Sequence, residues 1–306
     1  MASRDSLKKY RTRGTSVILA FASIYIIWGS TYLAIRIAIE TMPPFLMAGT
    51  RFVIAGALLY GWAMARGEPR PSRIHLRPII IIGGLLLLGG NGGVTWAEQT
   101  VPSGTAALLV ATVPIWMVLL DWLRPGGRQP ANRVFLGLGL GFAGIVLLIG
   151  PGQISGSNQT SLIGGLVIVL AALSWATGSI YSRSARLPES PLVSTALEML
   201  AGGALLLLVG SLAGEWGQLD SAQFSLRSIL ALVYLIFFGS IIAFTAYIWL
   251  LKVSTPARVS TYAYVNPVVA VFLGWAIVGE ALTAQTLLAV AIIISAVALI
   301  TVYRSP

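Results

Sequence analysis

Long apolar segments recur along the whole chain and are separated by short polar stretches. A helix that crosses a membrane needs about 20 mostly apolar residues, so this pattern predicts membrane spans rather than the alternating positions of strands. Ten spans would use roughly 200 of the 306 residues, which leaves no room for a separate soluble domain. The predicted spans are Ser16–Ile39, Phe45–Ala65, Pro78–Ala97, Gly104–Leu123, Val134–Ile149, Leu162–Ser182, Leu192–Ala213, Ser228–Leu251, Val259–Val278 and Thr286–Val302.

The chain aligns with itself. Residues 28–59 match residues 175–206 without gaps, which pairs Trp28 with Trp175 and Gly56 with Gly203, and a second offset pairs Pro114 with Pro267. A unit of five spans that repeats must enter the membrane from the opposite side the second time. We therefore predict an all-α integral membrane protein with two inverted five-helix repeats, residues 1–152 and 153–306, an arrangement typical of alternating-access transporters.

Composition and charge agree with this prediction. The chain is 57% hydrophobic and only 10% charged, whereas a soluble domain carries about 25% charged residues. The net charge of +10 reflects topology, because seventeen of the twenty basic residues fall on one side of a ten-span arrangement, together with both termini. The positive-inside rule makes that side cytoplasmic, and we expect no nucleic-acid partner.

The residues that common enzymes need are scarce. There is no cysteine, the single histidine is His75 in a basic loop, and no glycine-rich stretch is followed by the Lys-Ser/Thr of a phosphate cradle. We therefore expect no cofactor, no metal and no catalytic residues.

Aromatic and amide side chains gather near the middle of several spans. Proline at 114 and 267 frees a backbone carbonyl one turn back, which is tolerated in a membrane only where protein or water satisfies it. Polar side chains beside such breaks are common in midplane binding sites, although helix–helix packing is the alternative for each residue alone. The candidate substrate-binding residues are Trp28, Tyr32, Asn91, Thr95, Trp96, Trp175, Tyr247, Tyr262, Tyr264 and Asn266.

Charged residues inside spans are costly and are often functional. Arg51, Glu98 and Glu198, with Pro114 and Pro267, are candidates for coupling or gating, and Glu98 is our preferred proton-responsive group. Arg51 and Glu198 occupy equivalent repeat positions but differ in depth by roughly 10 Å, so we do not expect them to pair. We expect Arg51 to pair with Glu98 or Glu40, Glu198 with Arg183, Arg186 or Arg258, and Asp121 with Arg124.

Several motifs carry a family resemblance. They are Ile27–Tyr32, Pro43-Pro44, Asn91–Gly104, Val113-Pro114, Tyr262–Val269 and Gly279-Glu280. In this order they resemble the EamA-type branch of the drug/metabolite transporter superfamily, and within it the bacterial YedA-like subgroup. The resemblance implies a ten-helix exporter of the bacterial inner membrane, with both termini cytoplasmic and a central cavity for small metabolites, amino acids among them. The glycine-rich stretch 89–93 differs from the Tyr/His-rich third span of the aromatic amino-acid exporters, which argues against an aromatic cargo.

Three classes of function stay open at this point. A secondary active exporter of small metabolites or drug-like solutes fits best, with facilitated exchange, a channel or a lipid scramblase as the alternatives without ion coupling. An integral-membrane enzyme would need a nucleophile–base or metal constellation that the sequence does not display. We expect a small-molecule substrate and membrane lipids as partners, with the protein acting as a monomer.

Overall fold

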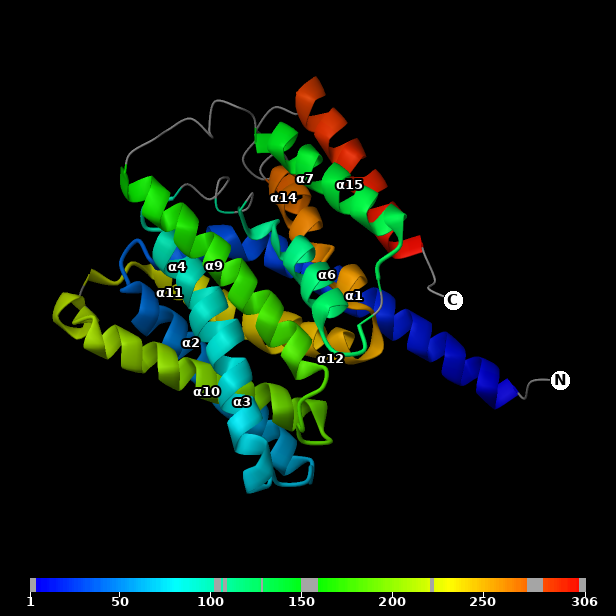
Figure 1. Cartoon of the computed structure of the whole chain (residues 1–306). Helices are drawn as coiled ribbons and strands as arrows, with labels where there is room; N and C mark the ends of the chain where they lie inside the picture. Colours follow the sequence, from blue (N-terminus) through cyan, green and yellow to red (C-terminus); the bar gives the residue numbers. More distant parts are fainter. Residues whose placement is uncertain are drawn as a thin grey trace.

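The computed structural model describes residues 4–101, 106, 109–127, 129–149, 159–220, 223–273 and 283–302, and all regular structure within these ranges is helical (Figure 1). The first part of the chain contains α1 (Arg4–Ala38), α2 (Pro44–Ala65), η1 (Arg73–His75), α3 (Leu76–Gly83), η2 (Gly84–Gly92), α4 (Gly93–Ala97), α6 (Val113–Leu123) and α7 (Asn132–Ile149). The second part contains α9 (Gln159–Ser182), α10 (Pro191–Leu212), η3 (Glu215–Gln218), α11 (Leu226–Tyr234), η5 (Leu235–Phe244), α12 (Thr245–Val253), α13 (Pro256–Val259), α14 (Tyr262–Leu273) and α15 (Ala284–Val302).

Six helices are long and apolar enough to cross a membrane, and they fall on the first, second, third, sixth, seventh and eighth predicted spans. The fifth and tenth predicted spans fall on the shorter apolar helices α7 and α15. The first span agrees with the prediction, because the apolar segment runs over Gly14–Ala38, but α1 itself begins at Arg4 and its N-terminal end extends beyond the bundle in Figure 1. Hydropathy does not detect this basic extension, although Lys and Arg are good helix formers.

Helices at equivalent repeat positions pack against each other. The most extensive helix contacts join α2 to α10 and α7 to α15, and Figure 1 shows α7 and α15 side by side. At the first interface a Cβ on Gly56 would lie 2.8 Å from the carbonyl oxygen of Ala196, and a Cβ on Gly203 would lie 2.8 Å from the amide nitrogen of Val53. The two aligned glycines therefore allow the same close approach from both sides.

The remaining contacts cross between the halves. Helix α1 packs against η5, α12 and α14, whereas α9 packs against η2, α4 and α6. The first helix of each half thus contacts the later helices of the other half, and the central space of the bundle has walls from both.

Two long helices change their hydrogen-bond pattern midway. Gly84–Gly92 (η2) and Leu235–Phe244 (η5) are π-helical and lie between ordinary helical turns. The two segments start 151 residues apart, so they occupy corresponding places in the two halves. π-Segments are rare and concentrate at functional sites, and the sequence pattern did not predict them.

The two prolines behave differently. Pro267 lies inside α14, as predicted. Pro114 does not interrupt a helix, because a turn at Ala111 and Thr112 precedes α6 and places Pro114 in its first turn. The missing amide hydrogen of a proline costs nothing at that position, so the break in the fourth span is the turn itself.

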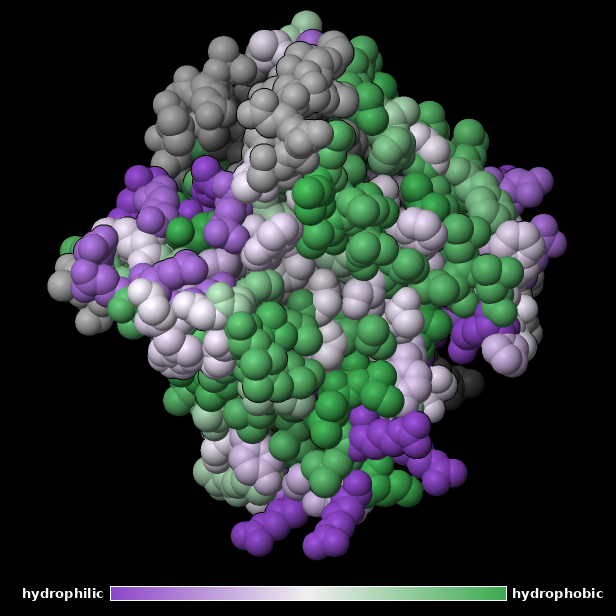
Figure 2. All heavy atoms as spheres, turned by 60° about the vertical axis from the view of Figure 1, so that its left-hand side comes forward, coloured by the Kyte–Doolittle hydropathy of each residue, from purple (hydrophilic) through white to green (hydrophobic). Residues whose placement is uncertain are grey.

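The outer surface is apolar. Leu and Ile side chains of α1, α9, α11 and α15 are largely exposed, and Figure 2 shows apolar residues over most of the face in view, with hydrophilic residues gathered toward its edges. An apolar surface of this extent is unfavourable in water and matches a lipid environment. The chain is a multi-pass membrane protein.

Candidate functional site

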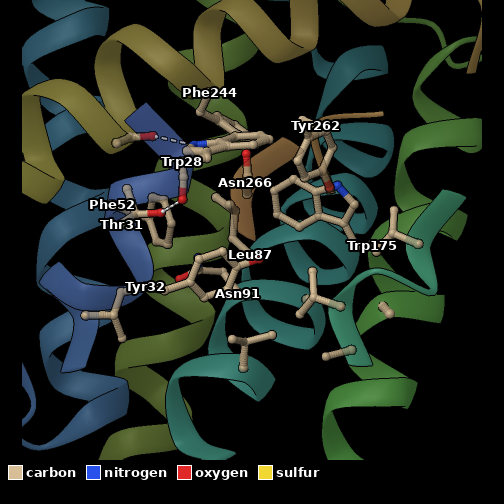
Figure 3. A pocket seen from close by; sticks show the side chains of 18 of the residues that line it. Trp28, Thr31, Tyr32, Phe52, Leu87, Asn91, Trp175, Phe244, Tyr262 and Asn266 are labelled. Carbon is tan, nitrogen blue, oxygen red and sulfur yellow. Dashed lines mark hydrogen bonds between the residues drawn. The ribbon is translucent and has the colours of Figure 1, made fainter. Parts of the chain in front are cut away.

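A cavity lies at the centre of the bundle, between the two halves (Figure 3). Its volume is about 80 Å³, counted as the space that the centre of a water molecule can reach. The cavity therefore has room for several waters or one small solute. Its walls are Trp28, Thr31, Tyr32, Ile35, Arg51, Phe52, Leu87, Gly90, Asn91, Val94, Val110, Val113, Ala171, Ala172, Trp175, Gly239, Phe244, Tyr262 and Asn266.

One face of α1 forms much of the wall. Its wall residues are Trp28, then Thr31 and Tyr32 three and four positions later, and then Ile35. This spacing puts the side chains on one side of a helix. The indole nitrogen of Trp28 donates a hydrogen bond to the carbonyl oxygen of Gly239 at 3.1 Å, which ties α1 to η5. This face of α1 is therefore held in place by the other half of the chain.

Aromatic rings close one end of the cavity. The ring of Trp28 lies 5.5 Å from that of Trp175, 4.9 Å from that of Tyr262 and 5.0 Å from that of Tyr247, measured between centroids. Trp175 also donates from its indole nitrogen to the Tyr247 hydroxyl at 2.8 Å. Edge-on and tilted ring pairs of this kind are favourable beyond the area that they bury, so the cluster forms a firm apolar wall.

Two amide side chains reach the same space. Asn91 comes from the π-helical segment η2, and its Oδ1 has no hydrogen-bond partner among the described residues. Asn266 lies between Trp28 and Trp175 in the view of Figure 3, and its amide nitrogen is best oriented toward the carbonyl oxygens of Tyr262 at 2.9 Å and Tyr25 at 3.3 Å. Asn266 thereby satisfies backbone near Pro267, whereas the buried Oδ1 of Asn91 has no partner among the described residues.

Arg51 is the charged residue of the wall. Its side chain runs from α2 to η5, where Nε donates to Ser240 Oγ at 2.8 Å, and it is only 3% exposed. The predicted pairing with Glu98 or Glu40 was wrong, because Arg51 points toward η5 and forms no ion pair with a described residue. Hydropathy gives the depth of a residue but not the neighbouring helix that it faces.

Four predicted binding residues lie outside the cavity wall. Tyr247 is fully buried behind the rings, and the hydroxyl of Thr95 donates to the Asn91 carbonyl at 2.9 Å. Trp96 packs against the main core, and Tyr264 packs between α14 and α7 with its hydroxyl 3.2 Å from the Leu138 carbonyl. Tyr264 is two residues from both Tyr262 and Asn266, and about 200° of rotation sends it to the opposite face of the helix.

The two candidate coupling carboxylates are buried but do not line the cavity. Glu98 follows the third span directly, neither of its carboxylate oxygens has a partner, and Arg36 Nη1 donates to its backbone carbonyl. Burial raises the pKa of Glu98 to about 8, although the nearby charge of Arg36 lowers it.

The expected partners of Glu198 were wrong. Glu198 accepts from Ser194 Oγ at 3.0 Å, and the basic residue near enough to influence its charge is Lys252. Arg183 instead donates to the carbonyls of Leu251 and Ser254. The predicted pair of Asp121 with Arg124 is confirmed at 2.7 Å.

Sequence reasoning missed several wall residues, notably Thr31, Ile35, Phe52 and Gly239. The helical spacing from Trp28 pointed to Thr31 and Ile35, whereas nothing in the sequence pointed to Gly239. Among the described residues no group of three or more His, Cys, Asp or Glu side chains is placed to hold a metal ion.

The chain is similar to a known protein family and to named transporters. The sequence pattern of the EamA-like transporter family matches twice, over residues 15–150 and 162–302. The uncharacterized inner membrane transporter YedA of Escherichia coli K12 is 44% identical over 286 residues, covering 92% of this chain and 89% of the relative. The uncharacterized transporter YoaV of Bacillus subtilis is 28% identical over 273 residues, which are 89% of this chain and 92% of that protein.

The fold is also found in a solved structure. A crystal structure with 25% sequence identity superposes with a TM-score of 0.76 and covers 94% of this chain and 98% of that chain. The helical membrane architecture, the two family matches and the identity with YedA agree. The chain belongs to the EamA-like transporter family and is a membrane transporter.

Proposed function

We propose that this protein is a secondary active exporter of small organic metabolites or drug-like solutes that works by alternating access in the bacterial inner membrane. It has ten spans in two inverted repeats, residues 1–152 and 153–306, and both termini are cytoplasmic. The relative from Escherichia coli is named an inner membrane transporter, which supports the location. The segregation of basic residues supports the orientation.

The observation that carries this proposal is the central cavity whose walls come from both halves. Trp28 and Asn91 belong to the first half, and Trp175 and Asn266 to the second. A site between two structural repeats can open to one side or the other when the repeats rock against each other. The two most extensive helix contacts, α2 with α10 and α7 with α15, are interfaces at which the two halves could move against each other.

Facilitated exchange without ion coupling is the second candidate. It is favoured by one observation, namely that the described wall of the cavity contains no Asp or Glu that could exchange a proton beside the substrate. In that case Glu98 would have a structural role at the end of the third span. A channel or a lipid scramblase would also lack coupling, but neither requires a central binding cavity between the two halves.

Flux measurements in proteoliposomes test the proposal. Purified protein is first screened against metabolites by thermal shift, and the solutes that stabilise it are then measured in counterflow. A carrier gives saturable uptake of labelled solute that unlabelled solute on the opposite side accelerates. Flux that rises linearly with concentration and is indifferent to the opposite side would instead identify a channel.

A further inference from the structure

We propose that the cavity binds a small organic carboxylate, with the anionic group on Arg51 and the apolar part against Trp28, Trp175 and Tyr262. This inference rests on the proposed function, since it takes the central cavity as the substrate site. It names the chemical class of the substrate, which the family match leaves open.

Arg51 carries a charge that no described acidic side chain compensates. Arg51 is 3% exposed, its Nε is bonded to the neutral Ser240 hydroxyl, and its Nη1 has no hydrogen-bond partner. Its Cζ also lies 4.6 Å from the centroid of the Phe52 ring. A buried charge without a counter-charge is strongly unfavourable, so an anion bound where Arg51 lines the cavity would stabilise this charge.

The geometry of the arginine selects the kind of anion. A guanidinium presents its donors in a planar fork that matches a carboxylate with two parallel hydrogen bonds. Arg51 is the one cationic side chain in the described cavity wall. A phosphate dianion would therefore bring a second negative charge into an apolar chamber with nothing to balance it, whereas a monocarboxylate is neutralised by one arginine.

The rest of the wall selects the body of the ligand. Leu87, Val94 and Val110 line the cavity together with the aromatic rings, and these groups favour apolar carbon. The cavity volume of about 80 Å³ allows a small solute, such as a short aliphatic acid. Asn91 also lines the cavity, and its buried Oδ1 has no hydrogen-bond partner among the described residues.

Gly239 brings the charged and the apolar contacts together. A Cβ at this position would lie 2.9 Å from Arg51 Nη2 and 3.2 Å from Thr31 Cγ2, so the guanidinium lies against η5 at a position where residue 239 has no side chain. The carbonyl of the same glycine accepts the hydrogen bond from Trp28. Trp28 and Arg51 are thus held by neighbouring residues of η5, Gly239 and Ser240, which suits a ligand with an acid at one end and carbon at the other.

Ligand binding to the purified full chain in detergent tests this inference. The probes are monocarboxylates of three to eight carbons, each beside its neutral amide, and the measurements are thermal shift and tryptophan fluorescence, because Trp28 and Trp175 line the cavity. At least one carboxylate should bind about tenfold or more tighter than its amide, as expected for hydrogen bonds to a charged group. Arg51→Gln should remove this preference, and Arg51→Lys should keep part of it.

A matched arginine provides the control. Arg183→Gln removes an arginine that binds the backbone carbonyls of Leu251 and Ser254 away from the cavity, and it should leave the preference intact. Should Arg51→Gln fail to fold, Gly239→Ala pushes on the guanidinium instead and should lower the ratio of carboxylate to amide binding.

Three results would overturn the inference: equal binding of every acid and its amide, a preference that survives Arg51→Gln, or chloride competing as well as the carboxylates. Counterflow of the same acids separates this question from the proposed function. Arg51-dependent binding without counterflow would support the carboxylate site and contradict the proposed carrier function. Counterflow of neutral solutes with no preference for acids would support the carrier function and contradict the carboxylate site.

Discussion

Trp28 and Trp175, which the sequence repeat aligns 147 residues apart, meet edge to face with their ring centroids 5.5 Å apart and their planes at 81°. Two positions that a pseudo-twofold axis exchanges can touch each other only close to that axis. If the halves are related as we propose, the tryptophan pair marks the axis, and the cavity that it lines is the point about which the halves would rock.

Removal of either ring should therefore reduce both transport and stability. Trp28→Ala deletes a buried ring and its hydrogen bond to Gly239, and a large-to-small change of this kind costs about 3–5 kcal/mol. Trp28→Phe keeps a ring and should cost less. Counterflow rate and thermal unfolding of the purified variants measure both effects. Trp62→Ala, at a tryptophan that is 48% exposed on α2, should change neither, and an equal loss there would remove the special role of Trp28.

Two neighbouring glycines should respond differently to alanine. A Cβ on Gly83 would lie 2.7 Å from the carbonyl oxygen of Glu198 and 2.8 Å from the amide nitrogen of Gly202, and backbone cannot move aside cheaply. A Cβ on Gly84 would meet only Leu205 Cδ1, at an ordinary 3.4 Å. Gly83→Ala should destabilise the protein by about 1–3 kcal/mol, whereas Gly84→Ala should be tolerated. Denaturation of both variants in the same detergent checks this, and equal midpoints would contradict the close packing of α3 on α10.

Topology can be measured directly. Reporter fusions after Pro71 and after Gly156 should report opposite sides of the membrane, inside for the first and outside for the second, because the basic residues segregate in that way. Gly156 lies outside the described residues, so this test is independent of the structure. The same side for both fusions would rule out the ten-span arrangement.

The sequence predicted how deep the site residues lie in the membrane better than which side of the helix each side chain faces. Trp28, Trp175, Tyr262 and Asn266 were found because mid-span aromatic and amide residues stand out in an apolar chain, and they do line the cavity. Tyr264 was placed there by the same reasoning, although a residue two positions from Tyr262 faces the other side of a helix. Periodicity within each predicted span would have excluded it.

The sequence did not predict which helices lie next to each other. Arg51 was expected near Glu98 because both lie toward the same membrane face, but Arg51 contacts Ser240, and it is Arg36 that reaches Glu98. Hydropathy orders residues along the membrane normal and says nothing of which span stands beside which. The π-helical segments were also beyond prediction, since no pattern of apolar and polar residues distinguishes them from ordinary helix.

The remaining prediction concerns proton coupling at Glu98. Its carboxyl is fully buried and has no hydrogen-bond partner, and burial raises its pKa to about 8, so the group is mainly neutral at pH 7 and becomes charged as the pH rises through about 8. If export uses protons and Glu98 binds them, flux of the wild-type protein should change between about pH 7 and pH 9.

Glu98→Gln imitates the protonated form at every pH. It should therefore make the flux insensitive to pH over that range and abolish flux driven by a pH gradient, while exchange at equal pH continues. Glu198→Gln is the matched control, because Glu198 is also fully buried and outside the cavity wall but is bonded to Ser194. That variant should keep the pH response of the wild type. A Glu98→Gln protein that still follows the pH gradient would remove Glu98 from the mechanism, and facilitated exchange would then be the simpler account, since no other carboxylate in the described part of the chain combines full burial with two unpartnered oxygens.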